Sequence, residues 1–229
     1  GDASSDTFNV TGLALTTGAG NASGNVAGGA LTVTINAAAT IGTGNLALLG
    51  GNGANSGAGG ALIATFANGL TTTGTIQVTA GNTATGAGGD ATLNLDGTVS
   101  SSTTLTVDGG TGAADVGLVT ISGDATFSAI VIDENAAAVG NAKIVIDGAT
   151  QTITGTINGG GANEGVLDVT NSGTATFASA IGTTAALSQL NIGTSASVGN
   201  AVFTGEVQAD AITVLATIGD SSADFNSNL

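Results

Sequence analysis

Short runs of Leu, Val, Ile and Thr recur along this chain, and many of them stop at Asp, Asn or Gly. Four end alike, with LNLD at 93–96, LTVD at 105–108, IVID at 130–133 and IVID at 144–147. A short β-rich run closed by a turn residue is typical of a strand that ends at a corner. A chain that repeats this unit is expected to stack similar coils.

The spacing of these runs supports stacking. Strand openings that follow Gly-rich turns fall at 30, 61, 91, 118, 143 and 166, and the interval between successive openings shrinks steadily along the chain. We expect a second strand in each unit, at 41–49, 74–79, 103–107, 125–132 and 152–157. The first part of the chain predicts strands at 7–11 and 13–17, and the widest Gly-rich loops are expected at 50–60 and 81–89.

The predicted fold is all-β, a right-handed parallel β-helix (β-solenoid) of about 8–9 degenerate coils. Short stacked strands need only small or branched inward side chains, which Val, Ile, Leu, Ala and a few Phe supply. The alternative is one or two β-sandwich domains, but such folds usually have a core Trp or Tyr, and this chain has neither. We expect a single domain over 1–229, with wider coils in 1–150 and tighter coils in 151–229.

Missing residue types argue against most catalysis. The chain has no His, Cys or Arg and one Lys, so Ser-His and Cys-His pairs, the usual zinc sites and phosphate-binding clusters are excluded. Sixteen acidic residues give a formal charge of -15, which would repel nucleic acid. We therefore expect a protein that is not an enzyme, requires no cofactor and does not bind nucleic acid.

No apolar run approaches the roughly 20 residues of a membrane helix. The absence of cysteine is compatible with a secreted bacterial protein. The first residue is Gly rather than Met, which suggests that a leader or a larger parent has been removed. We expect an extracellular location at a bacterial cell surface, with no membrane span.

The carboxylates that end the four strands are candidate calcium ligands: Asp96, Asp108, Asp133 and Asp147. If stacking places them at like corners, their repulsion favours a hard cation, with Asp115, Asp124, Glu134 or Glu164 as further ligands. The alternative is that these Asp residues are turn formers that keep the surface soluble. Lys143, the only basic residue, is expected on an exposed face beside an acidic neighbour.

Neither terminal region shows the charged cap that usually protects the end of a solenoid. The segments 6–10 and 211–218 read as strands with open edges. We therefore expect a homo-oligomer in which copies meet head to tail or edge to edge.

The sequences VLDVTNSGTATFASAIGTTAALSQLNIG at 166–193 and AVFTGEVQADAITVLATIG at 201–219 resemble the β-strand repeats of large bacterial surface proteins. These include autotransporter adhesin passenger regions and β-rich surface-layer proteins. The resemblance implies a non-enzymatic, self-assembling subunit of a surface layer, filament or fibrous appendage. The alternatives are an adhesin passenger segment that binds a glycan or protein of a host or neighbouring cell, and a phage fibre.

Overall fold

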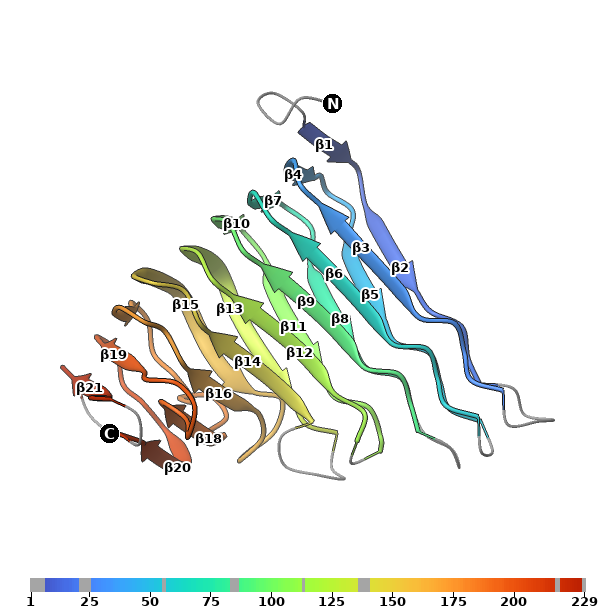
Figure 1. Cartoon of the computed structure of the whole chain (residues 1–229). Coiled ribbons are helices and arrows are strands. Elements are labelled where there is room, and N and C mark those ends of the chain that lie inside the picture. The colour runs from blue at the N-terminus through green and yellow to red at the C-terminus, as the bar shows by residue number, and fades with distance from the viewer. Residues whose placement is uncertain are drawn as a thin grey trace.

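The computed structural model describes residues 7–20, 26–54, 57–82, 87–112, 114–135, 141–216 and 219–227. These residues form strands, turns and loops with no helix. Every pairing between named strands is parallel, and the coils stack into a β-solenoid (Figure 1). The predicted β-helix is therefore confirmed, and the sandwich alternative is wrong because a sandwich requires two antiparallel sheets.

Each coil passes over three faces. Face one contains β1 (Thr7–Val10), β4 (Ala38–Ile41), β7 (Leu70–Thr72), β10 (Val99–Ser101), the first parts of β13 (Ala125–Asp133) and β15 (Gln151–Gly159), β17 (Ala175–Phe177), β19 (Asn200–Phe203) and β21 (Ser222–Phe225). Face two contains β2 (Leu13–Thr16), β5 (Leu46–Leu49), β8 (Ile76–Thr79), β11 (Thr104–Asp108) and the second parts of β13 and β15.

Face three is a sheet of eight strands, one from each of the first eight windings, and β21 begins a ninth. It contains β3 (Leu31–Ile35), β6 (Leu62–Phe66), β9 (Ala91–Leu95), β12 (Gly117–Ile121), β14 (Ala142–Ile146), β16 (Val166–Val169), β18 (Leu187–Ile192) and β20 (Ala209–Val214). Six coils have strand on all three faces. The last two have only the isolated bridge residues Ile181 and Val207 on face two, so the number of complete coils differs slightly from the expected 8–9.

The coils become shorter along the chain. On face three, the step along the sequence from Leu31 to its partner Leu62 is longer than the step from Gln189 to its partner Ala211. In the first six coils the strands change little in length, so the shortening there takes place in the loops between faces two and three. In the next two coils face two itself is reduced to single bridge residues. The early coils therefore have wide loops that project from the stack (Figure 1).

Glycine allows the backbone segments of the wide loops to approach closely. Within one loop, Gly51 N donates to Gly60 O at 3.0 Å. Between the loops of successive coils, Gly89 N donates to Gly51 O at 2.8 Å. A Cβ atom on Gly51 would collide with the carbonyl oxygen of Gly18 in the coil below. The high glycine content of these loops is thus explained by the close approach of the backbones of neighbouring coils.

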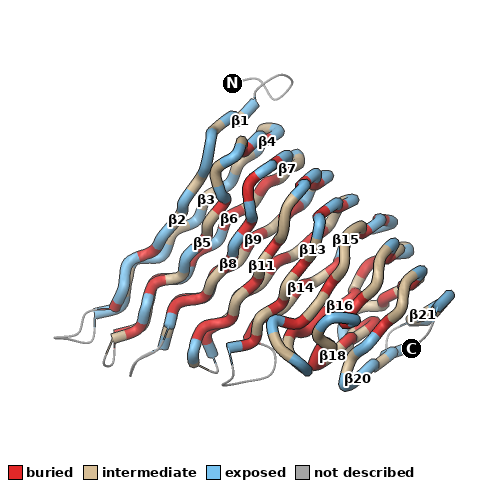
Figure 2. The backbone as a smooth tube through the Cα atoms, turned by 180° about the vertical axis from the view of Figure 1, so that it is seen from behind, coloured by how far each residue is buried: buried red, intermediate tan, exposed pale blue. Residues whose placement is uncertain are grey.

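The core runs along the axis of the stack (Figure 2). Inward residues alternate with outward ones, and each inward side chain lies on its equivalent in the next coil. On face two this produces a continuous column of buried residues, Leu46, Ile76, Leu105, Ile130 and Ile157. Burying each of these side chains stabilises the fold by about 1.5–3 kcal/mol.

Aromatic rings replace aliphatic side chains on face one near the C-terminus. Phe177 and Phe203 stack with ring centroids 5.0 Å apart, and Phe203 and Phe225 stack at 4.9 Å. The parallel register places these rings directly above one another. The outermost ring, Phe225, is only partly buried.

Candidate functional site: the carboxylate corner and the open ends

The four predicted calcium ligands lie in two columns on different corners. Asp108 and Asp133 are direct partners in the β11–β13 pair, at the end of face two. Asp96 and Asp147 follow β9 and β14, at the end of face three, and Ser122 of the intervening coil separates them. The Ser122 hydroxyl donates to Asp147 Oδ1 at 2.7 Å. Asp108 and Asp133 therefore share one corner, and Asp96 and Asp147 share another.

Asp108 lies in an unfavourable electrostatic position. Burial, followed by the charge of Asp133 one coil above, raises the pKa of Asp108 from 3.8 to about 6. Thr79 is its register partner in the coil below, and the Thr79 hydroxyl is buried with no hydrogen-bond partner among the described residues. The only basic side chain of the protein, Lys143, pairs with Asp168 on another face, so it does not offset the charge of this column.

Glu134 and Glu164 add two further carboxylates to the same corner. Burial raises the pKa of Glu164, a hydrogen bond from the Gly161 backbone lowers it, and the charge and hydrogen bond of Asp133 together with the charge of Glu134 raise it. We name this group, Asp108, Asp133, Glu134 and Glu164, the carboxylate corner.

Two other predicted ligands accept hydrogen bonds from backbone amides. Asp115 is 1% exposed, and its carboxylate accepts from Gly88 N at 2.7 Å and from Gly112 N at 3.0 Å. Asp124 accepts from Thr152 N at 2.7 Å. The bonds to Gly88 and Thr152 link successive coils, so both residues have a structural role that the sequence pattern did not reveal.

Across the described ranges, no group of three or more His, Cys, Asp or Glu side chains is placed to hold a metal ion. The carboxylate corner supplies two in-register oxygen ligands, Asp108 and Asp133, of the kind that Ca²⁺ prefers. Calcium binding there stays a prediction.

Lys143 lies on the outer side of β14, and its Nζ lies 2.9 Å from Asp168 Oδ2. Asp168 also accepts from Asn191 Nδ2 at 2.9 Å. The expected acidic neighbour of Lys143 is therefore present, one coil above on face three.

The inward side chains of the last coils are uncovered. In β20, Ile212 is 38% exposed and Val214 is 46% exposed, although their register partners Leu190 and Ile192 are fully buried. At the other end, Phe8, Val10, Leu13, Leu15, Leu31 and Ile35 pack on the core but are only partly buried. Figure 2 shows the pale outer coils against the red interior.

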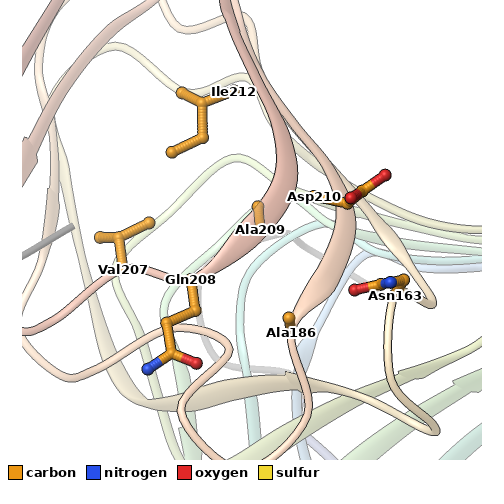
Figure 3. Close-up of a pocket in the computed structure, with 7 residues that line it drawn as sticks. All are labelled: Asn163, Ala186, Val207, Gln208, Ala209, Asp210 and Ile212. Carbon is orange, nitrogen blue, oxygen red and sulfur yellow. The ribbon is translucent and has the colours of Figure 1, made fainter.

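A cavity of about 380 Å³ lies beside β20 at this open end. Figure 3 shows Val207 and Ile212 on one side of β20, and Asp210 and Asn163 on the other. Val207 is the last member of the inward column on face two. The lining of the cavity therefore combines the apolar Val207 and Ile212 with the polar Gln208, Asp210 and Asn163.

The sequence pattern named Asp108 and Asp133 among four strand-ending carboxylates and Glu164 among the further ligands, but it did not separate the Asp108–Asp133 pair from the other two residues. A signal was present, because the interval from Asp108 to Asp133 equals the interval between the strand openings at 118 and 143. Glu164 follows a shorter loop and has no such spacing. Its position depends on the turn at 160–165, where Asn163 and Gly165 adopt positive φ.

Comparison with protein-family models, curated proteins and solved structures finds no match to the chain. None of the described residues belongs to a helix long and apolar enough to cross a membrane.

Proposed function

We propose that the protein is a non-enzymatic structural subunit of an extracellular bacterial layer, filament or appendage, and that it assembles with copies of itself. The observation that carries this proposal is the exposure of inward apolar side chains at both ends of the stack. Inside the molecule the same positions are closed by the next coil.

The free edges of the end strands support association in one direction. β1 pairs with β4 through one edge, and β21 pairs with β19 through the opposite edge. A second copy in the same orientation can therefore place its β1 beside β21. The two strands would then form the same parallel pairing that joins successive coils within the molecule. Main-chain hydrogen bonds and apolar contacts then stabilise the junction together.

At the C-terminal end, face one extends one strand further than face three. β21 adds a strand to face one above β19, whereas the described part of face three ends at β20. A docking copy thus meets two edge strands at different heights, β20 with the exposed Ile212 and Val214 and β21 with the partly buried Phe225. Isolated apolar residues on a surface are ordinary, but several inward-facing ones on edge strands indicate an interaction site.

The experiment compares association of the natural chain with that of an end variant and a side variant. Val214→Lys places a charge on the open end, and Ile63→Lys places the same charge on the lateral face, where Ile63 is 41% exposed. Sedimentation velocity and negative-stain microscopy at about 0.15 M salt measure assembly, since screening at this ionic strength limits the repulsion of the -15 charges.

We expect rods or filaments from the natural chain and from Ile63→Lys, and at least about tenfold weaker association for Val214→Lys, because a buried unpaired charge costs more than about 1.4 kcal/mol. A natural chain that stays monomeric at high concentration would contradict the proposal, as would equal association of the two variants.

A further inference from the structure

A shallow groove lies on the outside of the first coils, at the end of face two where β5 and β8 pass into the wide loops. Its volume is about 330 Å³, and its lining includes Thr16, Leu49, Asn52, Thr79 and Asn82. This volume falls within the range of small-molecule sites. We name it the loop groove.

The polar part of the loop groove consists of side-chain amides held in place by the stack. Asn82 N donates to Asn52 Oδ1 at 2.9 Å, which fixes the Asn52 side chain over the next coil. Among the described residues, no other group bonds the Asn52 NH₂ or the Asn82 amide, so Asn52 keeps a donor and Asn82 keeps a donor and an acceptor. Thr16 adds an exposed hydroxyl.

The apolar part is Leu49, which is 36% exposed although it belongs to a strand. Its register partners on either side are Thr16 and Thr79. The Thr79 hydroxyl is buried, so the groove presents the apolar surface of Leu49 next to the exposed residue Thr16 and to the amides. A sugar ring likewise presents a C–H face next to hydroxyl groups.

The negative charge of the protein restricts which ligands can bind in the groove. None of the residues that line the loop groove is charged, but the column that contains Leu49 and Thr79 continues to Asp108 and Asp133. With a net charge of -15, this surface repels phosphates and acidic sugars. Neutral ligands are not repelled.

We propose that the loop groove binds neutral saccharides, with Leu49 covering a C–H face and Asn52 and Asn82 bonding ring hydroxyls. This activity goes beyond self-assembly and does not depend on it, because the groove lies on the side of the first coils. The chain has no Trp or Tyr to stack on a sugar, so we expect a Kd of about 1 mM per site, with avidity gained by repetition along an assembly.

Saturation-transfer difference NMR on the full chain tests this proposal. The probes are neutral tetrasaccharides of glucose, mannose and N-acetylglucosamine, with oligogalacturonate as the acidic counterpart. Leu49→Ala and Asn82→Ala alter the groove, and Gln77→Ala alters an exposed side chain of β8 that does not line it. Melting temperatures verify that each variant is folded.

We expect transfer to at least one neutral tetrasaccharide, about fivefold weaker binding in Leu49→Ala and Asn82→Ala, and no change in Gln77→Ala. The absence of transfer to every neutral probe at millimolar concentration would overturn the proposal. A stronger response from oligogalacturonate, or binding unchanged in both groove variants, would overturn it as well.

Discussion

At the scale of single residues, the carboxylate corner holds a destabilising charge. The pKa of Asp108 is raised in the folded chain, so the folded state binds its proton more tightly than the unfolded state does. The stability that this proton contributes is complete below pH 3.8 and is lost as the pH rises through about 6. The raised pKa of Glu164 acts in the same direction.

Asp108→Asn should therefore stabilise the protein at pH 7 by about 1–2 kcal/mol, a value reduced for solvent screening of a half-buried group. It should also reduce the fall in stability between pH 4 and 7. Urea unfolding at both pH values measures this, with Asp96→Asn at the other corner as the control. A stabilisation that is equal at pH 4 and pH 7 would contradict the electrostatic origin.

Calcium provides a second test of the same corner. If Asp108 and Asp133 hold the ion, titration with Ca²⁺ after chelation should raise the melting temperature of the natural chain, because a ligand that binds only the folded state stabilises it. Asp108→Asn should abolish the increase. An unchanged melting temperature in the natural chain would show that calcium does not bind there.

At the scale of elements, the stacked Phe rings show how far the column geometry determines stability. Phe203 lies between two rings and is 1% exposed, whereas Phe225 has one ring neighbour and is partly buried. Phe203→Ala should cost about 3–5 kcal/mol, and Phe225→Ala clearly less. Chemical denaturation measures both, and equal losses would mean that Phe225 is covered in solution.

The wide loops provide a test of backbone packing. Gly51→Ala places a Cβ atom against the Gly18 carbonyl, whereas a Cβ atom on Gly29 would have no atom within 4 Å. We expect faster amide hydrogen exchange at Gly60 and Gly89 in Gly51→Ala, with unchanged exchange in the strands, and no effect in Gly29→Ala. Similar exchange in the two variants would show that the loop legs are not packed as described.

The sequence pattern predicted face three best. The expected strand openings at 30, 61, 91, 118, 143 and 166 all fall at or next to the first residues of the strands β3, β6, β9, β12, β14 and β16. Most of these strands alternate more and less buried residues, β16 is buried along its whole length, and each follows a loop that contains glycine, so the strand pattern and the turn pattern coincide. The expected strand at 41–49 proved to be two strands, β4 and β5, with a corner between them.

Face one was harder to predict. β7 and β10 have three residues each, too few for alternation to be visible in Leu70–Thr72 or Val99–Ser101. The two-strand coils expected from the sequence are therefore three-strand coils. The carboxylate corner could be predicted in part, because Asp108 and Asp133 end strands and Glu164 is a candidate from the sequence. The position of Glu164 at this corner and the loop groove depend on loop backbone that periodicity does not describe.

At the scale of the whole molecule, stacking determines the fold and supports the proposed assembly. Each coil is stable only because its inward side chains are covered above and below. Ile212 and Val214 occupy such positions without cover. In the proposed assembly, the junction between copies therefore continues the contact that holds the coils together.

Fibre diffraction from aligned assemblies tests this claim most directly. If copies stack end to end, the strands lie across the long axis, and the ~4.8 Å strand spacing should appear along that axis. A reflection at this spacing perpendicular to the axis would mean that the copies associate through their sides and would contradict end-to-end stacking.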